Sequence, residues 1–309
     1  MALSILEMVC PVILMFLLGW LCNRKRIFNA QGLAGIKALV GSVLLPVVLF
    51  NAFFTAEYSG RIALTFGVVY ASCALGLAAG FLLRRFARPY GRFLPFLVTN
   101  FEGGMMGYAL YALLYPGQTH IFAMADIGQT LAAFTVFLTA LQAVSRGKAD
   151  PKALLREAVT NPVLIAIVLG VALGALGVGK AALASAAGPL ISGAISFISA
   201  PVSGLILVIV GYELSFEKEL MRPVMITVLL RLGVTAVLLA LGALIVFSVI
   251  PFEKPLLVAL MLAWSLPAPF IIPLYADLGR DSEYISTVLS MQTVVSILLF
   301  IGVAAYSLA

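Results

Sequence analysis

The chain alternates between long apolar runs and short polar segments. Ten of the runs approach or exceed the ~20 residues that a helix needs to cross a bilayer. They cover residues 5–22, 33–54, 62–83, 93–115, 120–142, 161–178, 188–210, 223–249, 255–275 and 284–306. This pattern predicts an all-α polytopic membrane protein with ten transmembrane helices. The composition agrees, because 63% of the 309 residues are hydrophobic and only 10% are charged, whereas a soluble domain is about half apolar and a quarter charged.

The longest polar stretch, Val144–Pro162, divides the predicted spans into two sets of five. An odd number of spans in each half turns the second half upside down relative to the first, as in an inverted-topology repeat. We therefore expect a first repeat over 1–143, a cytoplasmic linker over 144–160 and a second, inverted repeat over 161–309. Asp150 before Pro151 predicts a short amphipathic helix over 151–159 in the linker.

Similar features recur at matching positions of the two halves. Spans 2 and 7 each carry a proline near the middle, spans 5 and 10 each carry a Gln-Thr pair, and spans 4 and 9 are each interrupted. The residues concerned are Pro46 and Pro201, Gln129-Thr130 and Gln292-Thr293, and Glu102-Gly103-Gly104 and Pro267, Pro269 and Pro273. The order of these matches favours an inverted repeat.

The net charge of +6 does not indicate nucleic-acid binding, because the basic residues lie mainly on one side of the predicted topology. The loops after spans 1, 3, 5, 7 and 9, counted together with Lys37 at the start of span 2, hold 15 of the 19 Lys and Arg residues. This asymmetry is typical of cytoplasmic loops and predicts a plasma (inner) membrane protein with both termini outside. The first apolar run lacks a basic start and a cleavage site, so we expect it to be a retained span.

The centre of span 4, in the stretch TNFEGGMMGYALYALLY, contains Asn100, Glu102, Gly103 and Gly104. Irregular backbone at membrane depth is tolerated only where it is buried in protein or lines a watery cavity. Interrupted helices at matching positions of two inverted halves indicate the substrate site of a transporter. At such breaks, freed N–H groups suit an anion and freed carbonyls suit a cation.

Glu102 has two interpretations. An acidic residue at mid-span costs about 2.5–3.5 kcal/mol on insertion scales, so it should face the interior or carry a proton. In the functional interpretation it binds a coupling ion, a proton or the substrate. In the structural interpretation it is a buried, protonated carboxyl that hydrogen-bonds a freed backbone group and has no transport role.

Other polar residues share helix faces near the breaks. Asp126 and Gln129 are at i and i+3 on span 5, and Gln292 and Ser296 are at i and i+4 on span 10. Each set could belong to the substrate or ion site, or Asp126 could be a snorkelling structural acid and the others interhelical hydrogen bonds. For Arg231, within span 8, we expect first an acidic partner and second a role in attracting substrate.

Several motifs resemble the auxin efflux carrier family, including its bacterial members, within the wider bile acid symporter-like superfamily. The motifs are NPVLIAIVLG at 161–170, APVSGLILVIVGYELS at 200–215, FEGGMMGYAL at 101–110 and LPAPFIIPLYADLGRD at 266–281. Glu102 stands where the family usually has Asn, Ala109 where it usually has Pro, and Ile271 where a polar residue is common. If the substrate is an anion, the carboxylate of Glu102 would repel it unless Glu102 is protonated.

The resemblance implies crossed, broken helices 4 and 9 and an elevator-like motion. Spans 3–5 and 8–10 would move against a scaffold of spans 1, 2, 6 and 7 that often forms a homodimer. It also implies organic-anion substrates. We expect substrate or ion binding at Asn100, Glu102, Gly103, Gly104, Asp126, Gln129, Pro267, Pro269, Gln292 and Ser296.

The leading hypothesis is a secondary active transporter of a small organic solute, with a carboxylate as first choice. It predicts no cofactor, and it predicts that H⁺ or Na⁺ is the coupling ion. The expected partners are a small-molecule substrate and membrane lipid but no nucleic acid, with a homodimer through the scaffold spans. One alternative is a sodium-coupled, bile-acid-symporter-like carrier, and another is a non-transporting receptor or lipid-binding module. An intramembrane hydrolase is disfavoured, because the sequence has no nucleophile–base motif and a single His.

Overall fold

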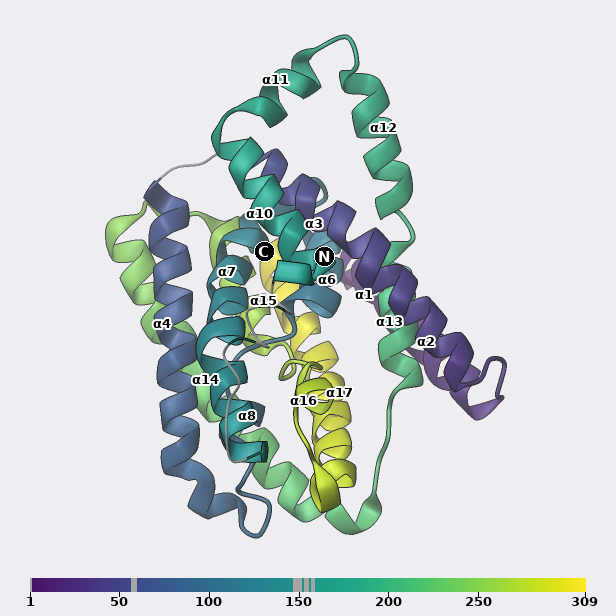
Figure 1. Cartoon of the computed structure of the whole chain (residues 1–309), viewed down its shortest axis with the longest axis vertical. Coiled ribbons are helices and arrows are strands. Elements are labelled where there is room, and N and C mark those ends of the chain that lie inside the picture. The colour runs from purple at the N-terminus through teal and green to yellow at the C-terminus, as the bar shows by residue number, and fades with distance from the viewer. Residues whose placement is uncertain (1, 57–59, 147–151, 153–155, 157–158) are drawn as a thin grey trace.

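The computed structural model describes residues 2–56, 60–146, 152, 156 and 159–309, and this part of the chain is helical with no strand. In chain order the helices are α1 (Ala2–Arg24), α2 (Ala30–Leu39), α3 (Leu45–Phe54), α4 (Gly60–Leu83), α5 (Leu94–Leu97), α6 (Tyr108–Leu114), α7 (Thr119–Ala132), α8 (Leu138–Arg146), α10 (Pro162–Ala175), α11 (Val178–Ala184), α12 (Gly188–Ser199), α13 (Val202–Tyr212), α14 (Met221–Val249), α15 (Lys254–Ser265), α16 (Ile272–Tyr275) and α17 (Ser282–Leu308) (Figure 1). The helix predicted over 151–159 falls mostly outside the described residues.

Helices occupy all ten ranges in which the sequence predicts a span. Among the described residues, six continuous helices are long and apolar enough to cross a membrane, and the bent pair α10–α11 would be a seventh. Single π-helical turns, η1 (Val40–Leu44) and η4 (Ala133–Phe137), join α2 to α3 and α7 to α8 within two of these six. The chain is therefore an integral, multi-pass membrane protein. Predicted spans 4 and 9 are not continuous, because each is divided by a break.

One group of helices is built from two closely packed pairs. Helix α1 packs along α13, and α3 packs along α10. Glycine permits the first contact at two places: a Cβ on Gly19 would collide with the carbonyl of Val208, and one on Gly211 with the carbonyl of Phe16. These pairs join predicted span 1 to span 7 and span 2 to span 6, so each pair contains one helix from each half.

A second group surrounds the two breaks. Helix α4 packs against α7 and α14, while α15 lies against α7, α14 and α17. The largest buried side chains near this centre are aromatic and meet edge to face, as Phe101 does with Phe122 and Trp264. Edge-to-face aromatic pairs stabilise beyond the area they bury, so the breaks are held in a rigid apolar surround.

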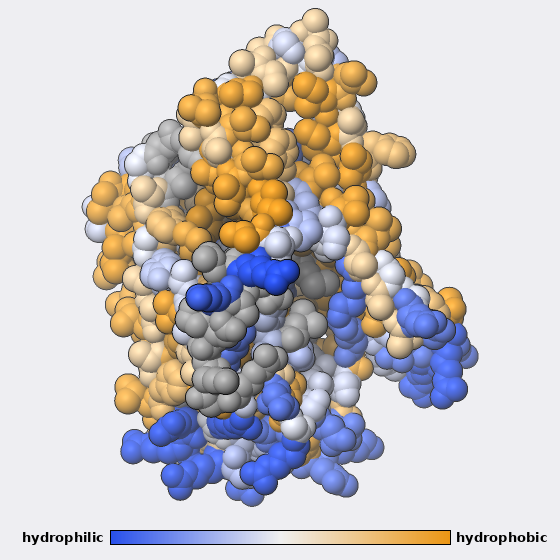
Figure 2. Space-filling view, viewed as in Figure 1, coloured by the Kyte–Doolittle hydropathy of each residue, from blue (hydrophilic) through white to orange (hydrophobic). Residues whose placement is uncertain are grey.

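The outer surface is strongly apolar over the upper part and the left flank of the visible face (Figure 2). Helices α11 and α12 form an extension at the top of Figure 1, where Leu190 is 77% and Phe197 84% exposed. Such large exposed apolar side chains are compatible with lipid but not with water. Hydrophilic residues gather at the opposite, lower end of Figure 2, as expected for a membrane protein with one strongly polar side.

Predicted span 6 is followed by a bend that the sequence analysis did not predict. Helix α10 ends at Ala175, and α11 begins at Val178 with its axis turned by 77°. Gly177 between them has a φ of +75°, a left-handed conformation that glycine adopts without steric cost. In span 7, by contrast, Pro201 lies between α12 and α13 without dividing the span.

Candidate functional site

The break in span 4 lies slightly earlier in the chain than the sequence predicts. Helix α5 ends at Leu97, residues 98–102 form no helix, and Gly103–Gly107 form a π-helical turn (η3) that leads into α6. Within the break, Asn100 has a φ of +48°, in the left-handed region that Asn tolerates better than most residues. Gly103 has a different role: a Cβ there would collide with the carboxylate of Asp126.

The break in span 9 lies where the prolines predict it. Helix α15 ends at Ser265 and residues 266–271 form no helix before the short α16. Pro267 and Pro269 lack a backbone N–H and cannot continue the hydrogen-bond ladder of α15. The helix resumes at Ile272, whose N–H donates to the carbonyl of Pro269 at 3.2 Å.

The two breaks bind each other directly through Glu102. Its backbone N–H donates to the carbonyl of Pro267 at 3.0 Å. Its side-chain Oε2 accepts from the N–H of Phe270 at 2.7 Å, and the residue is only 8% exposed. A carboxyl bound to a freed backbone donor is the contact that the structural interpretation of Glu102 requires. The same contact also places an ionisable group between the halves.

The two glutamines of the repeated Gln-Thr pairs both bind freed backbone groups. The side chain of Gln129 donates to the carbonyl of Phe101 at 2.9 Å and accepts from the Asn100 side chain at 3.2 Å. The side chain of Gln292 accepts from the N–H of Ala268 and donates to the carbonyl of Leu97, both at 2.9 Å. Gln129 thus serves the first break alone, whereas Gln292 joins both.

Among the residues that the structure describes, Arg231 has no acidic partner of the kind that was expected first. Its guanidinium, on a residue 3% exposed, donates instead to four backbone carbonyls. The acceptors are Leu97 at 3.2 Å, Thr99 at 3.1 Å, and Asn100 and Leu266 at 2.7 Å each. The expectation of an acidic partner was wrong because helix ends leave carbonyls without partners, and a guanidinium satisfies several at once through its fork of donors.

Asp126 and Ser296 are both buried but make different contacts. Asp126 is 2% exposed, with Oδ1 lacking a hydrogen-bond partner, and lies beside the Tyr108 hydroxyl and close to Glu102. The hydroxyl of Ser296 donates to the carbonyl of Gln292 in its own helix at 2.8 Å. The structure therefore brings Asp126 to the first break, while Ser296 makes no hydrogen bond to either break.

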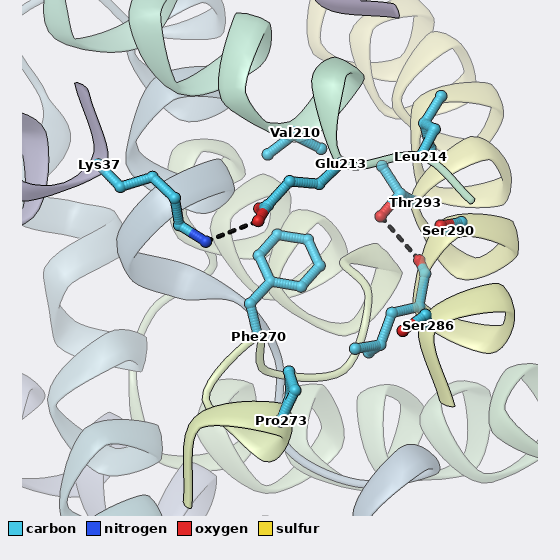
Figure 3. A pocket seen from close by; sticks show the side chains of 10 residues that line it. Lys37, Val210, Glu213, Leu214, Phe270, Pro273, Ser286, Ser290 and Thr293 are labelled. Carbon is cyan, nitrogen blue, oxygen red and sulfur yellow. Dashed lines mark hydrogen bonds and ion pairs between the residues drawn. The ribbon is translucent and has the colours of Figure 1, made fainter. Parts of the chain in front are cut away.

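A cavity of about 250 Å³, here called the Lys37 cavity, lies next to the second break. Its charged members are Lys37 of α2 and Glu213 at the end of α13, joined by an ion pair of 2.6 Å. The ring of Phe270 points into the cavity near Glu213 (Figure 3). The full lining is Lys37, Val210, Glu213, Leu214, Phe270, Pro273, Ser286, Leu289, Ser290 and Thr293.

A second cavity of about 140 Å³, here called the Asn51 cavity, lies next to the first break. It is lined by Leu45, Val48, Asn51, Tyr108, Ala109, Ala112, Thr119, Ser199, Val202, Ser203 and Ile206. Lys37 and Asn51 lie on one continuous helix, and their 14-residue separation corresponds to about 21 Å along its axis. The two cavities therefore open near opposite ends of the α2–α3 helix.

Sequence reasoning missed the charged pair of the Lys37 cavity. It counted Lys37 with the basic residues of the first loop, but the structure places it within α2. The signal was present: an acid at the end of span 7 and a lysine near the start of span 2 fall at the same predicted membrane face, so their partnership could have been proposed.

Comparison with known proteins adds the family. A family model described as "membrane transport protein" matches residues 4–151, the first of the two halves and the one that contains Asn100 and Glu102. Over these residues the chain is similar to this family, that of the auxin efflux carriers. The membrane transport protein family consists of transporters and not of enzymes. No curated protein matches the chain.

Proposed function

We propose that this membrane transport protein is a secondary carrier of a small organic anion, most simply a carboxylate, working by elevator-like alternating access. The observation that carries the proposal is the pair of cavities on opposite sides of the joined breaks. The second break lines the Lys37 cavity through Phe270, and α6, the helix that follows the first break, lines the Asn51 cavity from Tyr108 onward. A substrate bound next to the breaks would reach one cavity or the other as the breaks move.

The linings of the two cavities support an inverted repeat. Both are bordered by α13 and by the α2–α3 helix, which are predicted spans 7 and 2. The Lys37 cavity adds α16 and α17, the second-half parts of spans 9 and 10, whereas the Asn51 cavity adds α6 and α7, the matching parts of spans 4 and 5. Replacing each span by its counterpart in the other half therefore turns the lining of one cavity into the lining of the other. An alternating-access carrier built from an inverted repeat requires this relation.

The chemistry of the Lys37 cavity favours a small, singly charged anion. Lys37 is the cationic group in the lining, and Ser286, Ser290 and Thr293 add hydroxyl groups beside apolar Leu214 and Leu289. A volume of about 250 Å³ approaches the lower limit of about 300 Å³ for small-molecule pockets. In this proposal the substrate carboxylate takes the place of Glu213 beside the Lys37 ammonium.

The helix groups suggest which part moves. The α1–α13 and α3–α10 pairs would form the scaffold, which would also carry a homodimer contact. Helices α4 to α8 and α14 to α17, which hold both breaks, would shift together because Glu102, Gln292 and Arg231 join them internally. A rigid body of this kind carries a substrate site across the membrane without opening the breaks themselves.

The orientation follows from the positions of the basic residues. With the loop at Lys25 in the cytoplasm, the Lys37 cavity faces inward and the Asn51 cavity outward. In a cysteine-free variant, an impermeant thiol reagent should label cysteines at Gly117 and Lys180 from outside but not one at Lys25. Labelling at position 25 of intact cells would reverse the orientation.

The direct test is transport by the purified protein in proteoliposomes, with a panel of mono- and dicarboxylates, amino acids and uncharged analogues. We expect uptake of at least one small carboxylate and none of its amide. Binding of a solute without uptake would support the receptor alternative. Uptake confined to neutral or cationic solutes would exclude the anion assignment.

Two variants test the substrate contact. Lys37→Met should raise the KM for the carboxylate at least tenfold, because a hydrogen bond to a charged group contributes about 1.5–3 kcal/mol. Glu213→Gln keeps Lys37 and removes its competitor, so KM should stay unchanged or fall. An equal rise in KM for both variants would mean that the ion pair holds the helices together and binds no substrate.

A further inference from the structure

The sequence left open whether a metal cation such as Na⁺ binds at the breaks. In carriers with broken helices, such an ion is coordinated by unwound backbone carbonyls and by the carboxyl ends of half-helices. The carbonyls of that kind are present here. Leu97 ends α5, Thr99 and Asn100 lie in the first break, and Leu266 is the first residue after α15.

These four carbonyls already have a cationic partner. The guanidinium of Arg231 reaches all of them at 2.7–3.2 Å, with two acceptors on each terminal nitrogen. A guanidinium is a rigid, permanently charged fork that is more weakly hydrated than an ammonium, so it suits such a buried cluster of acceptors. It leaves this cluster little capacity for a metal ion.

We propose that Arg231 is a resident cation that takes the place of a coupling metal ion at the joined breaks. The carbonyls come from both halves, so the guanidinium also binds the two breaks together. The protein would therefore move its substrate without Na⁺. This inference rests on the proposed carrier function. It argues against the sodium-coupled alternative.

A freed backbone donor of the second break is likewise bound by an acidic side chain of the protein itself. The N–H of Phe270 in the second break is bound by the carboxyl of Glu102 at 2.7 Å. The chain thus supplies its own cation to the freed carbonyls and its own acidic group to a freed donor. Since both groups are covalently part of the protein, neither is lost when a substrate leaves.

The first test needs no transport and no variant. The thermal unfolding midpoint of the full-length protein in detergent is measured in equal concentrations of NaCl, KCl and choline chloride. We expect the three midpoints to agree within about 1 °C, since no sodium site remains to stabilise the native state. A rise specific to NaCl would overturn the inference, whatever the outcome of the transport assays.

The second test separates the charge of Arg231 from its shape. Arg231→Gln should lower the midpoint by more than about 5 °C, given that 1 kcal/mol shifts a large domain by about 2–4 °C. Arg231→Lys, which keeps a positive charge but has no fork, should fall between Gln and the parent. The control is Arg222→Gln, an exposed arginine on the same helix, which should not shift the midpoint.

Two results of that series would contradict the role. Equal midpoints for the Lys and Gln variants would mean that the carbonyls need donors and not a cation. A parent-like midpoint for Arg231→Gln would mean that the guanidinium does not hold the breaks. Failure of every transport assay would instead remove the carrier function and leave these stability results interpretable.

Discussion

Both breaks interrupt a predicted membrane span, but the first is formed with polar side chains and the second with backbone groups alone. The first break contributes side chains: Asn100 adopts the left-handed backbone and binds Gln129, and Glu102 reaches across to the other half. The second break, from Leu266 to Ile271, has no polar side chain at all. It contributes only backbone groups, and its N–H groups at Ala268 and Phe270 are bound by side chains from elsewhere.

This difference shows that the second break depends on the first. Proline opens the helix at the second break but supplies no partner for the groups it exposes. Buried backbone groups without partners cost about 1–3 kcal/mol each. Glu102 of the first break and Gln292 of α17 supply the partners that Pro267 and Pro269 do not, so the second break depends on the first through Glu102.

The largest effect is expected from closing the second break. Replacing Pro267 and Pro269 together by Ala should let α15 continue toward α16 and reduce transport to background, while membrane insertion persists. Pro189→Ala, at the exposed start of α12, is the matched control. Initial uptake rates in proteoliposomes give the measurement, and a double variant that transports at the parent rate would show that the break is incidental.

The next effect should come from the glutamines. Gln292→Leu leaves the N–H of Ala268 without its partner and removes a donor from the carbonyl of Leu97, at about 1–3 kcal/mol for each group lost. Gln129→Leu affects only the first break and should cost less. Thermal unfolding of both purified variants measures the order, and a larger loss for Gln129→Leu would contradict the role of Gln292 in joining the two breaks.

A smaller effect is expected from the hydroxyl that anchors the first break to α4. Thr99 is fully buried and donates to the carbonyl of Cys73 at 2.9 Å. Thr99→Val should cost about 1 kcal/mol. Thr293→Val is the control, since that hydroxyl bonds only the carbonyl of Leu289 in its own helix. If the two unfolding midpoints fall equally, the anchor adds nothing to the break.

The smallest effect on stability should follow Glu102→Gln, because the amide oxygen still accepts from the N–H of Phe270. Its effect on function is diagnostic. Gln cannot ionise, so the functional interpretation expects pH-dependent accumulation to disappear while substrate exchange continues. Accumulation with an unchanged pH dependence would establish the structural interpretation, in which the carboxyl only joins the two breaks.

Most of the fold could be predicted from the sequence, because membrane spans follow from hydrophobic length. The ten helical ranges and the position of the second break follow directly from apolar runs and from Pro267 and Pro269. Two local features were less accessible. The first break begins at Val98, before the glycines, because a left-handed residue such as Asn100 is not signalled as strongly as Gly-Gly. The bend at Gly177 uses a left-handed glycine that the sequence analysis did not single out.

The polar contacts of the site were predictable only in part. Helical spacing identified Asp126 with Gln129 and Gln292 with Ser296 as shared faces, but not which of them reach the breaks. Ser296 does not, because its hydroxyl is satisfied within its own helix. Arg231 was misassigned since charge complementarity suggests a carboxylate, whereas the carbonyls that bind it become available only through the three-dimensional meeting of the two breaks.

The guanidinium held by four carbonyls has a consequence for the electrical work of transport. A cation that belongs to the chain returns with the empty carrier, so over a full cycle it moves no net charge. The charge transferred is then that of the substrate and of any proton that accompanies it. A membrane potential contributes about 2.3 kcal/mol per elementary charge per 100 mV. A monovalent anion carried alone would therefore be driven toward the positive side by roughly 50-fold at 100 mV, and a cell that is negative inside would use such a protein for export.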